Sequence, residues 1–244
     1  GYRVDDSALE TSVMESIAKL GDREVFEKKY DLVGKDLPIL LFAMGDGNHS
    51  LATAKAIWEK TKEATSDPVA VMDSPTRYAL VELVNLYDES LEFEPIHRVL
   101  FELAAGRDLI SEMKDRFGAR LGLETVASLE EMKARVDVVE SGLHRFGLVS
   151  PEGYSVATVK EPEANLAVGT LQSFLDEFMK SGGAKELDYV HGTEPVDEHG
   201  RKAGNFGLYL PGMSKHDLFP TVILDGALPR KTFSMGEAQD KRFY

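Results

Sequence analysis

Apolar residues recur at helical spacing in several stretches of the chain, and each such stretch predicts an amphipathic helix. In residues 7–20, Leu9, Val13 and Ile17 fall on one face, and Gly21 ends the pattern. The other helices are expected at residues 49–64, 108–117, 129–138, 166–179 and 216–224, with a short helix or loop at 24–36.

Runs rich in β-branched and aromatic residues, bounded by turn residues, predict the strands. A buried strand is expected over residues 38–44 and a central strand over 76–87. Pro95 cannot donate a backbone hydrogen bond, so residues 91–101 are expected to form an edge strand, or a loop that leads into a short strand. Shorter strands are expected at 123–126, 187–190 and 206–210, and a hairpin is expected from 145–149 and 154–159.

This mixture of helices, strands and one hairpin predicts an α/β or α+β fold in which helices flank a mixed sheet. The 244 residues are expected to form a single domain, 1–244, with a softer boundary near residues 104–106. The chain begins at Gly1 rather than at Met, so we expect it to be the C-terminal portion of a longer protein.

Acidic residues outnumber basic ones, 42 Asp and Glu against 28 Lys and Arg, which gives a formal net charge of −14. That charge argues against broad electrostatic binding to nucleic acid or to an anionic membrane, but it allows a small basic pocket. The absence of cysteine excludes disulfides, a thiolate nucleophile and cysteine-ligated metals. We therefore expect a cytoplasmic protein that binds neither nucleic acid nor a membrane, with the oligomeric state left open.

Several familiar catalytic patterns are missing from the sequence. No two of the six histidines have the i, i+4 spacing of a helical zinc site. There is no Gly-x-Ser-x-Gly elbow, no Gly-x-x-x-x-Gly-Lys-Ser/Thr loop and no Gly-x-Gly-x-x-Gly that opens a helix. These absences argue against a zinc protease, a serine hydrolase, a P-loop enzyme and a Rossmann dinucleotide site.

A glycine-rich turn at residues 45–50 separates the apolar run at 38–44 from the helix that follows it. Glycines can adopt φ > 0 and allow a ligand to approach the backbone, and a helix N-terminus favours anions. The spacing alone leaves a second interpretation open, a glycine turn with good helix caps. The candidate ligand-binding residues of this loop are Gly45, Asp46, Gly47, Asn48, His49 and Ser50.

Three further junctions carry residues that suit an anion, and each has a structural alternative. The pair at 97–98 could reach an anion or could form a surface dipeptide paired with nearby glutamates. The histidine at 191 could contact a ligand or could cap a turn. The segment 230–234 combines fixed charge with hydroxyls, or is a solvated tail. The candidates are His97, Arg98, His191, Arg230, Lys231, Thr232 and Ser234.

Four motifs occur in order: Gly-Asp-Gly-Asn-His-Ser-Leu-Ala-Thr-Ala-Lys at 45–55, Phe-Glu-Pro-Ile-His-Arg-Val-Leu at 93–100, Asp-Tyr-Val-His-Gly at 188–192, and Leu-Pro-Arg-Lys-Thr-Phe-Ser-Met-Gly-Glu at 228–237. Together they resemble the bacterial and archaeal domain of unknown function family 1015, over nearly the whole chain. The resemblance implies a ParB/sulfiredoxin-like fold, in which an Asp-Gly-His-His-Arg type loop at a strand-to-helix junction binds nucleotide phosphate. It also implies a relation to enzymes that phosphorylate free serine.

The resemblance assigns roles residue by residue. Asp46 and Gly47 match the first two positions of that loop, and His49 matches its second histidine. Asn48 and Ser50 depart from it. The departure at Ser50 matters most, because an arginine there would bind phosphate through two hydrogen bonds and a serine offers one neutral hydroxyl.

The expected function is nucleotide or phosphate binding, extending to transfer of a phosphoryl group to a small acceptor such as a free amino acid. ATP or ADP with Mg²⁺ is the expected cofactor. The resemblance implies catalytic roles for His49 and Asp46, with Asp46 also holding the metal. Arg98, Arg230 or Lys231 would supply the missing cation. The alternative is a non-catalytic ligand-binding or regulatory module of the same fold.

Overall fold

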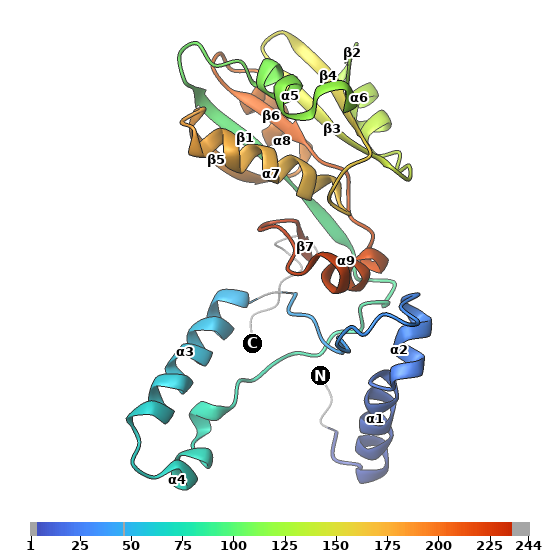
Figure 1. The fold of residues 1–244 in the computed structure, drawn as a ribbon, viewed down its shortest axis with the longest axis vertical. Coiled ribbons are helices and arrows are strands. Elements are labelled where there is room, and N and C mark those ends of the chain that lie inside the picture. The colour runs from blue at the N-terminus through green and yellow to red at the C-terminus, as the bar shows by residue number, and fades with distance from the viewer. Residues whose placement is uncertain (1–3, 46, 236–244) are drawn as a thin grey trace. The chain divides into compact units, whose positions relative to one another are not determined.

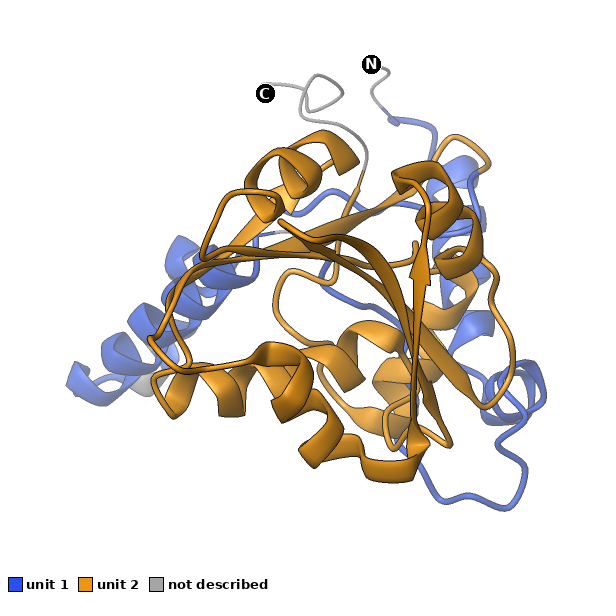
Figure 2. Ribbon diagram, turned by 90° about the horizontal axis from the view of Figure 1, so that it is seen from above, with its two compact units in different colours: residues 1–88 blue, residues 89–244 orange. Residues whose placement is uncertain are grey.

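The computed structural model describes residues 4–45 and 47–235, and Figure 1 shows their helices and strands. The chain divides into two compact units, residues 1–88 and residues 89–244, coloured separately in Figure 2. Residues 104–106, where a softer boundary was expected, lie between β1 and α5 inside the second unit. A division by internal packing does not test the number of domains, so the expectation of one domain stays a prediction.

The first unit is helical, and its first two helices begin at aspartate caps, Asp6 and Asp22. The Asp6 carboxylate accepts hydrogen bonds from the backbone N–H groups of Ala8 and Leu9 at 2.8 and 2.9 Å, which satisfies two of the unpaired donors of the first turn. The predicted helices at 7–20 and 49–64 are confirmed. The helices of this unit are α1 (Ser7–Leu20), α2 (Arg23–Lys29), α3 (Asn48–Ala64) and α4 (Pro68–Met72), with a 3-10 turn at Pro75–Arg77.

The two strands expected in the first unit are wrong. Residues 38–44 and 78–85 have no strand pairing among the described residues, and Phe42 and Leu80 are 55% and 102% exposed. An apolar run becomes a strand only when partner strands satisfy its backbone and a packed face covers its side chains. The described part of this unit buries only two hydrophobic side chains, Phe26 and Leu32.

The second unit is built on a seven-stranded sheet in the order β2-β4-β3-β6-β1-β5, with β7 pairing the start of β1. Every described pairing is antiparallel. The predicted α/β or α+β class, with helices flanking a sheet, is confirmed. The described sheet is antiparallel rather than mixed, which is the α+β arrangement. The strands are β1 (Phe93–Leu103), β2 (Leu121–Val126), β3 (Leu143–Ser150), β4 (Gly153–Lys160), β5 (Ala184–His191), β6 (Phe206–Tyr209) and β7 (Phe233–Met235).

The expectation that residues 91–101 form an edge strand or a loop is wrong, because β1 lies between β6 and β5. Pro95 is tolerated because the start of β1 has a different neighbour from the rest of the strand. Phe93, Glu94 and Pro95 pair with β7, and the pairing with β5 begins only at Ile96. The missing N–H of the proline therefore falls outside the central ladder.

Helices cover both faces of this sheet (Figure 1). On one face, α5 and α7 pack on Leu100, Leu148 and Leu208. On the other face, α6 and α8 pack on Val149 and Tyr209. The predicted helices and the hairpin of this unit are confirmed, and no helix among the described residues is long and apolar enough to cross a membrane. The helices are α5 (Leu109–Phe117), α6 (Leu129–Val136), α7 (Ala167–Lys180), α8 (Thr193–Gly200) and α9 (Leu218–Asp225), with 3-10 turns at Gly118–Arg120 and Lys215–Asp217.

Candidate functional site

The fold buries an arginine in the middle of the sheet. Arg98 lies on β1 directly opposite Tyr189 of β5 and Leu208 of β6. Residues opposite each other in an antiparallel pair project to the same side, so these three side chains share the face that α7 covers. Arg98 is 0% exposed. The interpretation of residues 97–98 as a surface dipeptide is therefore wrong.

The hydrogen-bond partners of the Arg98 guanidinium are all uncharged. Its Nε donates to Gln172 Oε1 at 3.1 Å, one terminal nitrogen donates to the Ile96 carbonyl, and the other donates to the Arg230 carbonyl at 3.1 Å. A guanidinium has five N–H donors, and these bonds engage three of them. A fully buried cation is thus solvated by an amide and two carbonyls, with no carboxylate in hydrogen-bond contact among the described residues.

A second guanidinium approaches the same tyrosine. The central carbons of Arg98 and Arg230 lie 4.9 and 5.6 Å from the centre of the Tyr189 ring, within the range of cation–π attraction. Arg230 also donates to Asp176 Oδ1 at 3.1 Å, and that oxygen accepts from Gln172 Nε2 at 2.8 Å. We call these five residues the guanidinium cluster.

The cluster carries two guanidiniums and a single carboxylate. The pKa of Arg98 is lowered to about 10, mainly by burial and also by the positive charge of Arg230, while Tyr189 and Asp176 act in the opposite direction. A guanidinium with that pKa still carries its charge at neutral pH. The cluster is therefore a site of surplus positive charge on a chain whose net charge is −14.

The Tyr189 hydroxyl adds an unused polar atom. It is buried and has no hydrogen-bond partner among the described residues. Most buried hydroxyls in folded proteins are hydrogen-bonded, so an unpartnered one beside two cations is a feature that a bound ligand would explain.

His97 takes no part in the cluster, because successive residues of a strand point to opposite faces. It is buried on the other face, where its Nδ1 accepts a hydrogen bond from the Leu210 N–H at 3.1 Å. Its ring stacks on that of Tyr209, with 4.5 Å between the ring centres. Burial, with a smaller contribution from Arg98, lowers the pKa of His97 to about 4. This imidazole is neutral at physiological pH, and its hydrogen bond connects β1 to the end of β6.

Residues 230–234 had a solvated tail as their structural alternative, but β7 in this segment pairs with β1. Thr232 is buried and donates to the Pro229 carbonyl at 2.6 Å, whereas Lys231 is exposed with φ 55°. Ser234 lies opposite Glu94. His191 is exposed at the end of β5, two residues from Tyr189 and on the same side of the sheet.

The loop at residues 45–50 belongs to the first unit, whereas the cluster belongs to the second. Gly47 is the N-cap of α3 and has φ 78°, which confirms the expected positive φ at that position. Asn48, His49 and Ser50 are exposed in the first turn of α3, and Gly45 precedes them. Asp46 lies outside the described residues, so its expected catalytic and metal-binding roles stay predictions.

The described residues hold no group of three histidines and carboxylates that could bind a metal ion. Mg²⁺ in phosphoryl-transfer sites is commonly held by one or two carboxylates together with the phosphates of the substrate. The cluster fits the phosphate part of such a complex, because guanidiniums bind phosphate oxygens in paired hydrogen bonds. Of the residues named here, Asp46 is the one predicted to hold the metal.

Three members of the cluster were not selected as candidates from the sequence: Gln172, Asp176 and Tyr189. Gln172 interrupts the apolar stripe of the helix predicted at 166–179 and is buried in the structure. A polar residue on the buried face of an amphipathic helix is the signal that could have found it. Asp176 lies one turn further along the same helix face.

A comparison with protein-family models matches residues 5–178 to DUF1015, which is described as a protein of unknown function. No curated protein and no solved structure matches the chain. The matched range spans most of the first unit and extends through Arg98 and Gln172 in the second.

Proposed function

The chain belongs to the DUF1015 family of proteins of unknown function, and from its geometry we propose that it binds a nucleotide or another small phosphorylated molecule at the guanidinium cluster. The observation that supports the proposal best is Arg98. Its charge is fully buried and is surrounded by neutral acceptors. Burying an ion without a counter-ion is costly, and an anionic ligand would reduce that cost.

Arg230 is the member of the cluster at which we expect the phosphate group to bind, because it lies on the exposed side. Its side chain is 66% exposed, and that of its partner Asp176 is 55% exposed. An exposed ion pair exchanges readily with solvent and contributes little stability. A phosphate group can therefore replace the carboxylate on Arg230 at small cost and gain paired hydrogen bonds from the guanidinium.

In the enzymatic form of the proposal, the ligand is ATP or ADP with Mg²⁺, and a phosphoryl group passes to a small acceptor such as a free amino acid. The metal would neutralise charge on the phosphate oxygens. Arg98 and Arg230 would stabilise the charge that develops on the transferred group, and electrostatic positioning supplies most of the catalysis in such reactions. The catalytic roles that the resemblance implies for His49 and Asp46 stay predictions for the first unit alone.

The second candidate is a non-catalytic binding module, and the placement of His97 favours it. The histidine that is adjacent to Arg98 in sequence faces the opposite side of the sheet, where its Nδ1 is occupied by the Leu210 N–H. The cluster thus has cations for binding a phosphate but lacks that imidazole as a base.

Calorimetry with Mg-ATP, Mg-ADP and inorganic phosphate tests binding in the full chain. Wild-type protein should bind at least one of them, and Arg230→Gln should weaken binding at least tenfold. Arg145→Gln is the matched control, because Arg145 pairs with Glu140 away from the cluster. No binding of any of these anions at millimolar concentration, or wild-type affinity in Arg230→Gln, would contradict the proposal.

A mass-spectrometric assay separates the two candidates. Incubation with Mg-ATP or Mg-ADP and a mixture of free amino acids should yield a phosphorylated product if the protein is a phosphotransferase. The product should be lost in His49→Ala. Tight binding with no product identifies the non-catalytic module.

A further inference from the structure

A cavity of about 420 Å³ lies in the second unit, beside the guanidinium cluster and separate from it. Its walls come from α7, from the end of α5 and the turn after it, from residues 162–166, and from the segment 225–229 that leads to Arg230. Cavities of a few hundred cubic ångströms are of the size that holds small organic ligands.

The walls of the cavity combine apolar surface with hydroxyl groups. Phe117, Val159 and Leu166 contribute apolar side chains, and Thr170 and Thr221 contribute hydroxyls that are largely buried. The Thr170 hydroxyl is held 2.8 Å from His144 Nδ1, where burial lowers the pKa of the histidine. An apolar lining with a few fixed polar groups is typical of sites for small organic molecules.

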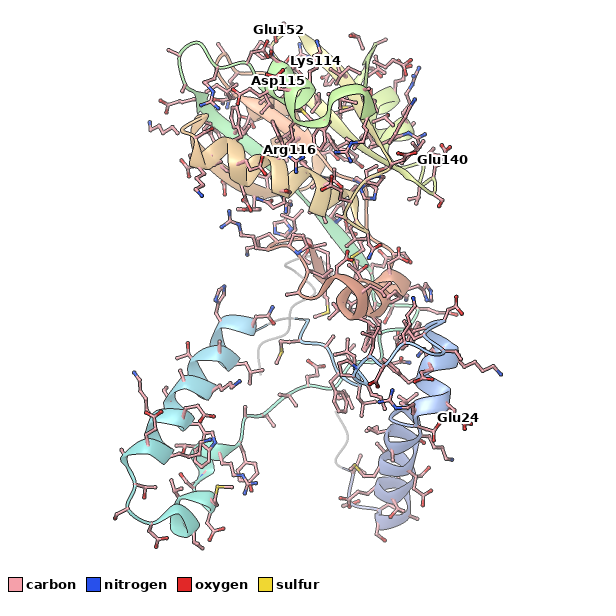
Figure 3. The ribbon with its side chains drawn as sticks, in the orientation of Figure 1. Glu24, Lys114, Asp115, Arg116, Glu140 and Glu152 are labelled. Carbon is pink, nitrogen blue, oxygen red and sulfur yellow. The ribbon has the colours of Figure 1, made fainter. Side chains whose placement is uncertain are left out.

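The charged residues of the cavity wall are balanced rather than basic. Arg120 contacts Glu163 at 3.3 Å, and Asp225 accepts from the backbone and side chain of Asn165 at 3.1 and 2.6 Å. Arg116, labelled in Figure 3, lies 3.3 Å from Glu177 through a buried Nε that makes no hydrogen bond among the described residues. The cavity therefore suits the uncharged part of a ligand better than its phosphate.

The cavity and the cluster follow one another along α7. Gly169 and Ser173 line the cavity, while Gln172 and Asp176 belong to the cluster. Residues three and four apart share one face of a helix, so all four lie on the same face of α7. The segment 225–229 also connects the cavity to the cluster, because Pro229 lines the cavity and is followed in sequence by Arg230.

The absence of a side chain at Gly169 lets α7 pack closely against its neighbours. A Cβ placed there would lie 3.0 Å from Ala164 Cβ and 3.8 Å from Pro229 Cγ. The helix and the 225–229 segment therefore approach each other closely at one end of the cavity, and the wall is built from packed elements.

We propose that this cavity binds the apolar body of the phosphorylated ligand, a ring system of about the size of a nucleoside, while the phosphate lies on Arg230. The inference rests on the proposed phosphate binding at the cluster. It assigns the ligand class: a phosphate ester with a ring-sized apolar group that carries one or two hydrogen-bonding atoms. The Thr170 hydroxyl would contact one of those atoms, and Phe117 would contact the ring.

The test uses phenyl phosphate, Mg-ADP and inorganic phosphate as probes, with calorimetry on the full chain. Wild-type protein should bind the two esters at least tenfold more tightly than inorganic phosphate. Ser173→Trp places an indole in the cavity from an exposed position, and it should remove this difference while leaving the affinity for inorganic phosphate unchanged. Ser111→Trp, at an exposed serine of α5 outside the cavity, should behave as wild type.

A neutral probe separates failure of this inference from failure of the proposed function. Benzyl alcohol should shift the NMR signals of the Gly169 and Thr170 amides in wild type but not in Ser173→Trp. If no phosphate binds and benzyl alcohol still gives these shifts, the proposed function fails and the cavity remains a site for a ring. Equal affinity of wild type for phenyl phosphate and inorganic phosphate overturns the inference, as does unchanged ester binding in Ser173→Trp.

Discussion

Arg98 and Tyr189 lie opposite each other on β1 and β5, and the guanidinium carbon is 4.9 Å from the centre of the ring. The ring stabilises the buried cation through its π face, but its hydroxyl has no partner among the described residues. Tyr189 thus both stabilises the charge of Arg98 and offers a hydroxyl without a hydrogen-bond partner among the described residues.

Tyr189→Phe should leave the free energy of unfolding unchanged or raise it by about 1 kcal/mol, because it removes a buried hydroxyl that makes no hydrogen bond. Tyr189→Leu should lower it, because the variant loses the ring over Arg98. Urea titration of both variants measures the difference. Marked destabilisation by Tyr189→Phe would show that the hydroxyl has a structural partner.

Asp176→Asn should tighten phosphate binding by up to about fivefold, the range expected for removal of one exposed ion pair. The carboxylate competes with the ligand for Arg230, and an asparagine can still accept from Gln172 through its amide oxygen. Asp115→Asn is the matched control, since it makes the same charge change on α5. Weaker phosphate binding in Asp176→Asn, measured by calorimetry at fixed ionic strength, would mean that Asp176 orients Arg230 for the ligand.

Acid should destabilise the second unit through His97. Its pKa is about 4 in the folded protein, below the ordinary histidine value of 6.5, so the unfolded chain binds a proton that the folded chain does not. The contribution of neutral His97 to the free energy of unfolding is fully present above pH 6.5. It is lost as the pH drops toward 4, by about 3 kcal/mol in total. Asp137, whose pKa is raised by burial, acts in the opposite direction.

Urea titrations at pH 7, 6 and 5 measure this effect. His97→Gln should have a smaller slope of stability against pH than wild type, since glutamine can accept from the Leu210 N–H without titrating. If the free energy of unfolding depends equally on pH in wild type and in His97→Gln, His97 is not the cause of the acid destabilisation.

Gly207→Ala should destabilise the protein by about 1–3 kcal/mol, because α8 packs directly on β6 at this residue. A Cβ at Gly207 would lie 2.6 Å from the Val196 carbonyl oxygen and 3.1 Å from Val149 Cβ. Gly122→Ala is the control on another strand, where the nearest atom would be 3.8 Å away. Thermal unfolding by circular dichroism compares the two, and equal midpoints would argue against close packing of α8.

The sequence predicted most local elements of the second unit, though not α8 or β7, because their signals are local. Ser128 accepts from the Glu131 N–H and Glu131 accepts from Ala127, so the cap that begins α6 is readable from a few consecutive residues. The position of β1 was missed because Pro95 was judged by its missing N–H alone. The strand that pairs with each end of β1 comes from a distant part of the chain, so local sequence does not reveal it.

The same limit explains the two wrong strands of the first unit. The runs at 38–44 and 76–87 have the composition of strands, but composition does not supply the partner that a strand needs. The guanidinium cluster was found only in part for a related reason. Arg98 and Arg230 belong to the sequence motifs at 93–100 and 228–237, whereas Asp176 joins them only because α7 packs over that face of the sheet.

The pairing of β7 with β1 also has a consequence for how the protein assembles. Ser234 is opposite Glu94, a partner about 140 residues earlier in the chain. Contacts that close so large a loop lose much chain entropy and are expected to form late in folding. The backbone carbonyl of Arg230, which accepts from Arg98, immediately precedes this late segment. A nascent chain would therefore acquire its hairpin and helices first, and the hydrogen bond from Arg98 to the Arg230 carbonyl would form only when β7 docks.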